Sequence, residues 1–320
     1  MASAFPWGDL SQKVHIKEVS PRDGFQNVAK WIPTEIKIEL INAMIRAGVK
    51  EIEVTSFMHP KWIPQLKDAE EVCAGIERRP GVKLVGLVPN RRGVERAIKA
   101  GVDGVGITMS ASETHNTKNV NMTRQQSMAA AREAFELANA NGLAFTGGVA
   151  TAFGCPMEGE VPISSVEWLI DNYVDAGIRH VRLGDSTGMA NPGQVEHLVA
   201  HLLDKYPGVT LTLHFHNTRG MGLANVLAGL RAGARHFDGC VAGIGGCPYA
   251  PGATGNIDTI DLVHMLHEMG IDTGIDLAAL LDVGRRLEEV MGNKLYSSVM
   301  AAGRTCDLHR PEIVDQAQLV

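Results

Sequence analysis

The feature that most constrains the fold is a short phrase that recurs along the chain. At residues 46–49, 99–102, 175–178 and 231–234, a helical pattern ends in Ala-Gly and leads straight into an apolar stretch. Glycine suits the end of a helix because it adopts the left-handed conformation without steric cost. The repetition indicates a chain built from recurring helix–strand units.

Eight runs rich in β-forming residues alternate with helical patterns. They are residues 14–19, 51–55, 83–88, 104–108, 144–150, 180–183, 210–214 and 236–241. Most are nearly continuous apolar stretches, as expected of parallel strands covered on both faces. A capping box at Thr123–Gln126 and the pair Asn191-Pro192 mark two helix starts.

The pattern predicts an α/β chain with one catalytic domain over residues 1–320. We expect a (β/α)8 TIM barrel over about 14–275 and a helical C-terminal extension over about 276–320. The alternative is an open doubly wound sheet, which usually carries a Gly-rich loop after its first strand. Here Ser-Pro-Arg-Asp-Gly follows Val19 instead, which favours the barrel.

Composition excludes several classes of protein. The net charge is −6 and no basic stripe stands out, so we expect no nucleic-acid partner. No run of about 18 apolar residues is present, so we expect no membrane span. The five cysteines are scattered and odd in number, which argues against a disulfide framework. The first residues do not resemble a signal peptide, and we expect a cytoplasmic protein.

Polar residues gather where the expected strands end, which is where TIM barrels carry their active sites. They are Arg22, Asp23 and Gln26 after the first strand, Glu53 and Ser56 along the second, His115 after the fourth, Asp185 after the sixth, His214 and His216 at the seventh, and Asn256 after the eighth. A core would not favour these side chains, so we interpret them as the candidate site.

Four of these residues form a candidate metal site. His214 and His216 are two apart, so a strand directs both to one face. Asp23 comes from the strand that closes the ring beside the eighth, and Asn256 adds an amide oxygen. Two nitrogens and two oxygens with room for water suit Mg²⁺ or Mn²⁺, with Zn²⁺ or Co²⁺ as alternatives. The His-x-His pair alone is weak, and the convergence of all four carries the prediction.

Several stretches resemble the 3-hydroxy-3-methylglutaryl-CoA lyase family of the DRE-TIM metallolyase superfamily. They are residues 18–27, 55–57, 60–65, 154–159, 183–185 and 241–250, within a likeness that runs from about 14 to 308. The most specific is Gly-Gly-Cys-Pro-Tyr-Ala at 245–250. The related isopropylmalate and homocitrate synthases are not expected to share this cysteine loop.

The resemblance implies a role for each matching residue. Asp23, His214, His216 and Asn256 match the metal ligands, and Arg22 matches the residue that stabilises the enolate oxygen. Cys247 matches the catalytic cysteine, and Glu53 and Asp185 match further active-site acids. His214 is also expected to act in catalysis, and Gln26, Ser56, Gly148 and His115 to contact substrate. The implied reaction cleaves a tertiary 3-hydroxyacyl-CoA to acetyl-CoA and a keto acid, in a homodimer.

These residues also suit that chemistry without the family. A divalent metal lowers the pKa of a tertiary hydroxyl, so that a carboxylate or histidine can take its proton. Breaking the carbon–carbon bond leaves charge on a thioester enolate, for which a fixed guanidinium is a suitable partner. A thiol such as Cys247 is then a plausible proton donor to the enolate carbon.

Four positions depart from the family pattern. Thr146 and Gly148 stand where arginine and tyrosine are usual, His115 where phenylalanine is usual, and Asn217 where aspartate is usual. Glycine in place of tyrosine is expected to make space, and the changed charge to alter which acid group is held. We therefore expect either 3-hydroxy-3-methylglutaryl-CoA or an analogue with a different 3-substituent.

Two other functions remain open from the sequence. The same metal and arginine serve a condensing acyltransferase that adds acetyl-CoA to a 2-oxo acid, although the Cys247 loop argues against it. A non-catalytic barrel is the other alternative, and the intact set of Arg22 and the four candidate ligands argues against that.

Overall fold

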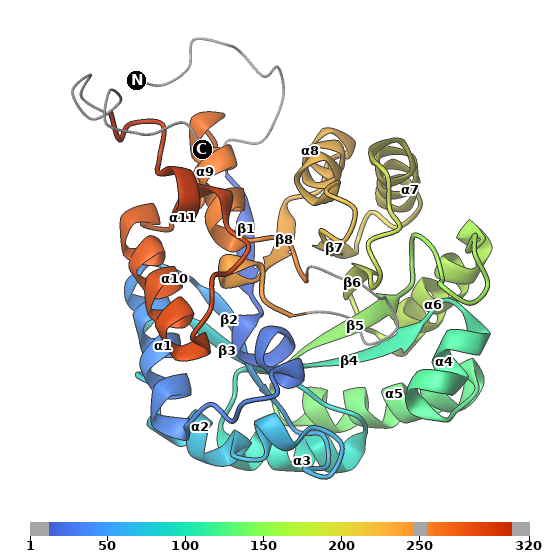
Figure 1. The fold of residues 1–320 in the computed structure, drawn as a ribbon. Helices are drawn as coiled ribbons and strands as arrows, with labels where there is room; N and C mark the ends of the chain where they lie inside the picture. The colour runs from blue at the N-terminus through green and yellow to red at the C-terminus, as the bar shows by residue number, and fades with distance from the viewer. Residues whose placement is uncertain (1–12, 246–254, 309–320) are drawn as a thin grey trace.

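The computed structural model describes residues 13–245 and 255–308, and these residues form a closed barrel (Figure 1). The strands pair in parallel and in chain order, and β1 lies beside both β2 and β8. They are β1 His15–Glu18, β2 Glu51–Ser56, β3 Lys83–Leu87, β4 Gly104–Ser110, β5 Ala144–Ala150, β6 His180–Asp185, β7 Thr210–Phe215 and β8 His236–Gly239. The TIM barrel expected from the sequence is confirmed.

Helices surround the strands. They are α1 Thr34–Arg46, α2 Ala69–Gly75, α3 Arg91–Ala100, α4 Glu113–Val120, α5 Arg124–Ala140, α6 Ile163–Ala176, α7 Pro192–Lys205, α8 Gly222–Ala232, α9 Thr259–Glu268, α10 Leu277–Met291 and α11 Ser298–Ala302. Thr123 and Gln126 form the predicted capping box of α5, and Asn191 caps α7. No described helix is both long and apolar enough to cross a membrane.

The C-terminal helices join the outer layer of the barrel. Helix α10 packs against α1 and α9, on the left of the view in Figure 1. Helix α11 contacts α9 and α10. These helices are the predicted C-terminal extension, whereas the boundary near residue 275 stays a prediction.

Strand ends differ from the predicted ones where the site begins. Strands β4 and β6 continue to Ser110 and Asp185, because these residues still pair with Ala150 and Phe215 of the neighbouring strands. Strand β8 ends earlier than predicted, because residues Val241–Gly243 form a 3-10 turn. Ala242 in that turn has a φ of 57°, which an extended strand does not allow.

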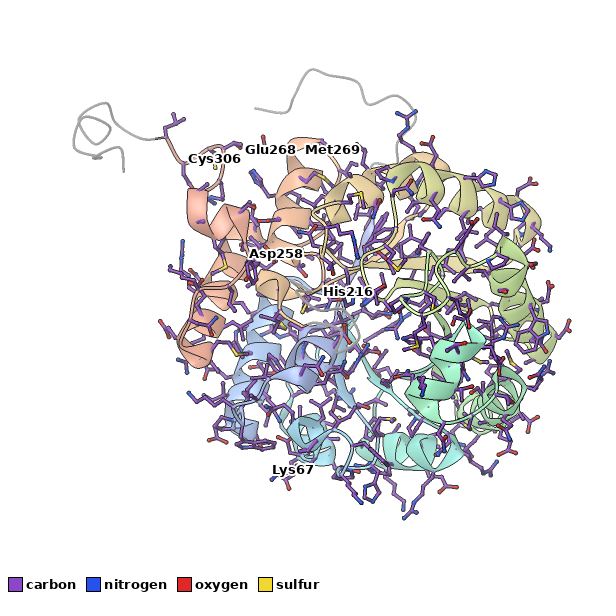
Figure 2. All side chains as sticks on the ribbon, turned by 45° about the vertical axis from the view of Figure 1, so that its right-hand side comes forward. Lys67, His216, Asp258, Glu268, Met269 and Cys306 are labelled. Atoms are coloured by element: carbon purple, nitrogen blue, oxygen red, sulfur yellow. The ribbon has the colours of Figure 1, made fainter. Side chains whose placement is uncertain are left out.

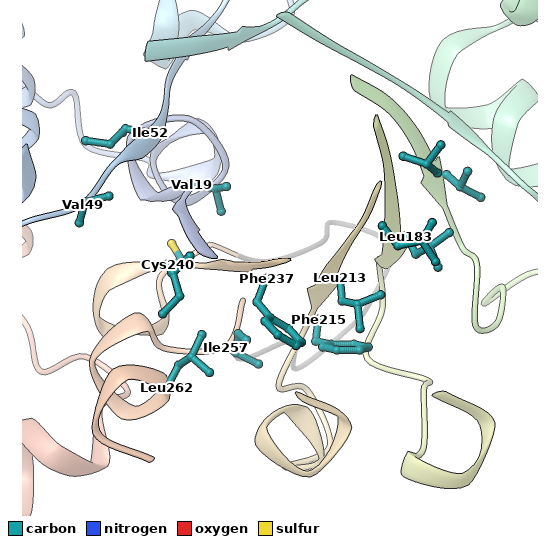
Figure 3. Packing of buried hydrophobic residues seen from close by; sticks show 14 of the residues in the cluster. Val19, Val49, Ile52, Leu183, Leu213, Phe215, Phe237, Cys240, Ile257 and Leu262 are labelled. Atoms are coloured by element: carbon teal, nitrogen blue, oxygen red, sulfur yellow. The ribbon is translucent and has the colours of Figure 1, made fainter. Parts of the chain in front are cut away.

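Successive side chains of each strand alternate between the outer face, which packs against the helices, and the interior of the barrel. Leu213 and Phe237 point outward, where a Cβ added to Gly229 of α8 would contact both, and Figure 3 shows them with other apolar residues on this side. Arg182 of β6 and Glu53 of β2 point inward, since their side chains meet although these strands are not neighbours. The interior of this barrel is therefore polar and charged near the site.

Candidate active site

A tight turn after β1 brings two charged residues to the barrel mouth. Residues Ser20–Gly24 form a π-helical turn in which the carbonyl of Val19 accepts from the backbone N–H groups of Arg22 and Asp23 at 3.1 and 2.7 Å. Turns of this type are frequent at functional sites. Buried Glu18 secures this turn, because its carboxylate accepts from the N–H of Ser20, from the N–H of Val241 and from Thr259 Oγ1.

Arg22 is held by two carboxylates. Its Nε donates to Glu53 Oε2 at 2.6 Å, and its Nη1 donates to Asp23 Oδ1 at 2.5 Å. Burial opposes ionisation of Glu53, but Arg22 and then Arg182 outweigh it and hold the pKa of that carboxyl below its usual value. Arg22 is therefore a fixed cation in a buried site.

Asp23, His214 and His216 converge on one point, and their ligand atoms all lie within 4.8 Å of one another. His214 Nε2 is 3.3 Å from His216 Nε2 and 3.7 Å from Asp23 Oδ2. Figure 2 places His216 near the middle of the molecule. Burial opposes ionisation of Asp23, but Arg22 and the two histidines lower its pKa. The cluster therefore offers one carboxylate and two imidazoles to a cation.

The donor set around this cluster fits a divalent metal. Asn256 donates from Nδ2 to Asp23 Oδ2 at 2.9 Å, while its buried Oδ1 has no hydrogen-bond partner among the described residues. His216 Nδ1 is also buried there without a partner. Buried polar atoms are normally paired, so the orphaned Asn256 oxygen beside the cluster is consistent with a fourth ligand. The arrangement supports a divalent metal and does not identify the ion.

Asp238 of β8 orients one of the imidazoles, and the sequence analysis did not identify it. Its Oδ2 lies 3.1 Å from His214 Nδ1, and the residue also faces Lys17 at 3.3 Å and Arg182 at 3.6 Å. A carboxylate on Nδ1 favours the tautomer whose Nε2 carries the lone pair. The Nε2 atom of His214 is the one that faces Asp23 and His216.

Asp185 lies at the end of β6 with one oxygen bound and one free. Its Oδ1 accepts from the N–H groups of Met189 and Ala190 at 2.7 and 3.2 Å, and its buried Oδ2 has no hydrogen-bond partner among the described residues. Burial raises the pKa of Asp185 to about 6, although the two backbone donors oppose this. A carboxyl with this pKa exchanges protons near neutral pH.

The other predicted substrate contacts lie at the same end of the barrel. Gln26 Nε2 donates to Asp23 Oδ1 at 3.0 Å, so it joins the cluster. Ser56 is buried at the end of β2 and accepts from the N–H of Met58 at 3.3 Å. His115 is buried in α4, with Nδ1 2.6 Å from Ser110 Oγ. Ser56 also donates to the carbonyl of Leu87 at 3.5 Å. The roles of Ser56 and His115 toward substrate stay predictions.

Cys247 lies outside the described residues, in the range 246–254. The residues on either side of this range, Gly245 and Gly255, both adjoin the cluster. Gly245 has a φ of +96°, and a Cβ there would lie 2.8 Å from Asn256 Nδ2. A Cβ on Gly255 would overlap the carbonyl of Gly245. Only glycine fits at these two positions, which lie beside the candidate metal site.

Two of the four departures from the family pattern have a structural explanation. Gly148 does not open a void, because a Cβ there would lie 2.5 Å from Thr108 Oγ1, so the expectation of added space at this position is wrong. Asn217 accepts from the N–H of Gly222 at 3.0 Å, at the start of α8. An aspartate could accept the same bond, so this contact does not distinguish the two residues.

The fold and the site together define a TIM-barrel enzyme with a candidate metal-binding centre at the C-terminal ends of its strands. The family model described as HMGL-like matches residues 13–287, and the chain belongs to that family of carbon–carbon lyases. Hydroxymethylglutaryl-CoA lyase YngG of Bacillus subtilis is 47% identical over 286 residues, which cover 89% of this chain and 96% of that protein. The human mitochondrial hydroxymethylglutaryl-CoA lyase is 39% identical over 94% of this chain and 92% of its own.

Solved structures agree with this assignment. An HMG-CoA lyase from Acinetobacter baumannii, in complex with coenzyme A and 3-methylmalate, matches with a TM-score of 0.90 and 47% identity, over 95% of this chain and 99% of its own. The carboxyl transferase domain of Rhizobium etli pyruvate carboxylase matches with a TM-score of 0.70 at 18% identity, over 90% of this chain and 49% of its own. That second likeness concerns the fold alone.

Proposed function

We propose that the chain cleaves 3-hydroxy-3-methylglutaryl-CoA, or an analogue with a different 3-substituent, to acetyl-CoA and a keto acid. The observation that carries the proposal is that Arg22 binds Asp23, the same carboxylate that borders the two imidazoles. Arg22, which would stabilise an enolate, thus lies next to the candidate metal ligands, which would hold the ion that binds the hydroxyl. The names of relatives that match nine-tenths of the chain support the same reaction.

The proposed chemistry is a retro-Claisen cleavage with no net consumption of water. Asp23, His214, His216 and Asn256 would hold a divalent ion, which would supply Lewis-acid polarisation of the substrate when bound. Mg²⁺ or Mn²⁺ is our proposal for the ion, because hard oxygen ligands make up half of the set.

Residues of the chain carry the proton transfers. Asp185, whose pKa is about 6, takes the proton of the tertiary hydroxyl. The carbon–carbon bond then breaks, and its electron pair becomes the thioester enolate, which faces the guanidinium of Arg22. The thiol of Cys247 protonates the enolate carbon to give acetyl-CoA and regains its proton from solvent, and Asp185 releases the proton it took from the hydroxyl to solvent. His214, Glu53 and Gln26 position these groups.

The first experiment follows acetyl-CoA release from 3-hydroxy-3-methylglutaryl-CoA with Mg²⁺ or Mn²⁺, against an EDTA control. Rapid release that EDTA stops is the expected result. Should only other 3-hydroxy-3-alkyl-acyl-CoAs be cleaved, the substrate is an analogue. No cleavage of any of them would overturn the proposal in favour of condensation.

Cys247→Ala separates the lyase from the condensing acyltransferase. The lyase is expected to lose most of its rate, because the enolate lacks its proton donor. A condensing enzyme would be little affected. The cytoplasmic location and the homodimer expected from the sequence stay predictions.

A further inference from the structure

Arg182 is a buried cation that the proposed chemistry does not use. It lies on β6 and points into the barrel, where 9% of its side chain remains exposed. Its Nη2 donates to Thr108 Oγ1 at 2.9 Å, and its Nη1 lies 3.4 Å from Glu53 Oε1 and 3.6 Å from Asp238 Oδ2. The guanidinium thus reaches β2, β4 and β8 across the interior.

Arg182 is less tightly paired than Arg22. Arg22 holds its two carboxylates at 2.5–2.6 Å, whereas both ionic contacts of Arg182 exceed 3.3 Å and its one short bond is to a neutral hydroxyl. A guanidinium has five N–H donors in a fork that matches a carboxylate. Arg182 therefore retains the capacity to bind one more anion.

The missing side chain at Gly148 determines where Arg182 points. In the strand register, Gly148 of β5 pairs with Thr108 of β4 on one side and with Arg182 of β6 on the other. Arg182 reaches Thr108 across β5. A Cβ on Gly148 would lie 2.5 Å from Thr108 Oγ1, so a larger residue would disturb the hydroxyl that Arg182 binds.

Glu53 links Arg182 to Arg22, the residue that faces the enolate in the proposed reaction. Its Oε2 binds Arg22, and its Oε1 faces Arg182, so the two guanidinium groups lie at opposite oxygens of one carboxylate. In the proposed reaction, Arg22 stabilises the enolate. Arg182 is then available to bind a negative charge elsewhere on the acyl group.

We propose that Arg182 binds the free carboxylate at the far end of the acyl group and makes the enzyme prefer acyl-CoAs that carry one. This inference rests on the proposed function, because it concerns the acyl group of that reaction. Arg182 is then a specificity-determining residue, and Gly148 and Thr108 are the residues that position it.

The test compares two substrates in Arg182→Gln, Arg182→Lys and wild-type protein. One is 3-hydroxy-3-methylglutaryl-CoA, and the other is 3-hydroxy-3-methylpentanoyl-CoA, which has a methyl group in place of the carboxylate. Arg182→Gln is expected to lower kcat/KM at least about tenfold more for the first substrate than for the second. Arg182→Lys keeps the charge and is expected to retain part of the preference. Arg231→Gln, an exposed arginine of α8 that is 65% accessible, is the control.

An equal loss for both substrates, or no loss for either, would overturn the inference. If Arg182→Gln does not fold, as judged by circular dichroism, Thr108→Val gives the test with the cation in place. It removes the hydroxyl that orients Arg182, and a smaller shift in the same ratio is expected. An unchanged ratio in a folded Thr108→Val protein would then count against the inference.

Equilibrium binding separates this inference from the proposed function. Acetoacetate is titrated calorimetrically into protein loaded with Mn²⁺ and CoA. Wild-type protein, Arg182→Lys and Arg231→Gln are expected to bind it, and Arg182→Gln to bind it at least about tenfold more weakly. If wild-type protein cleaves none of the 3-hydroxyacyl-CoAs, the proposed function fails while this comparison still decides the role of Arg182. Equal binding by Arg182→Gln would overturn that role.

Discussion

Asp238 contacts one of the candidate metal ligands, His214, and orients its imidazole ring. Its carboxylate accepts from Nδ1 of His214, while Lys17 and Arg182 keep it charged in a buried position. We predict that Asp238→Asn lowers the affinity for Mn²⁺ by about 10- to 100-fold, because a neutral amide fixes the His214 tautomer less strongly. Calorimetric titration measures this. Asp282→Asn, an exposed change on α10, is the control, and equal affinity in both variants would contradict the prediction.

Asp185 leads to a prediction for the pH dependence of the rate. Burial raises its pKa to about 6, so it is protonated below that pH and cannot accept the hydroxyl proton. We expect kcat/KM to fall as the pH drops through about 6. Asp185→Asn is expected to lower kcat/KM about 100-fold or more and to remove this step. A persistent acid limb in Asp185→Asn would assign the proton transfer to another group.

At the scale of single residues, the sequence pointed to candidate site residues such as Glu53 but not to the buried residues Arg182 and Asp238 that contact them. Glu53 was identifiable because it is a charge within an apolar strand. Arg182 and Asp238 are also charged residues within their strands. They come before the ends of those strands, where we looked for candidate site residues. The partners of Arg182 lie on β2, β4 and β8, none of which pairs with β6, so its role depended on knowing which side chains meet across the interior.

At the scale of elements, the contact of α6 with β5 depends on a missing side chain. A Cβ on Gly147 would lie 2.7–2.9 Å from the ring of Tyr173, which is fully buried and donates from its hydroxyl to the carbonyl of Gly148 at 3.0 Å. We predict that Gly147→Ala lowers the free energy of unfolding by about 1–3 kcal/mol, because the ring has to shift in a packed core. Urea unfolding measures it.

The matched control for this prediction is Gly208→Ala, where an added Cβ would meet nothing within 4 Å. It is expected to leave the free energy of unfolding nearly unchanged. If both variants unfold at the same urea concentration, the close contact of Tyr173 with β5 does not contribute as inferred.

The sequence predicted the elements well because their signals are local. The Ala-Gly phrases, the capping box and the apolar runs each depend on neighbouring residues, and the strands followed within one or two positions. The π-helical turn after β1 was not predictable, because buried Glu18 stabilises it through residues more than 200 positions away. A similar distance in sequence hid the approach of Gly245 to Asp23, whose carbonyl oxygen would lie 3.1 Å from a Cβ on Gly245.

At the scale of the molecule, the two ends of the barrel have different tasks. The C-terminal ends of the strands carry the candidate site, whereas the N-terminal ends carry three histidines from β1, β6 and β8. His15 and His236 stack with ring centroids 4.6 Å apart, and His180 meets His236 edge-on at 6.0 Å. In such barrels, features at the N-terminal end contribute to stability rather than catalysis.

This cluster predicts a loss of stability in acid. Burial lowers the pKa of His236 to about 4, with His15, His180, Lys17 and Lys83 adding to the effect. As the pH falls from about 6.5 to 4, the unfolded chain takes up a proton at this residue and the folded chain does not, so the free energy of unfolding falls in that window.

We expect His236→Gln to flatten this dependence in urea unfolding at pH 7 and pH 5. His197→Gln, an exposed change on α7, should keep the wild-type slope, and activity at pH 7.5 should survive in both variants because the site lies at the other end. A slope in His236→Gln as steep as in His197→Gln would show that the acid sensitivity arises elsewhere.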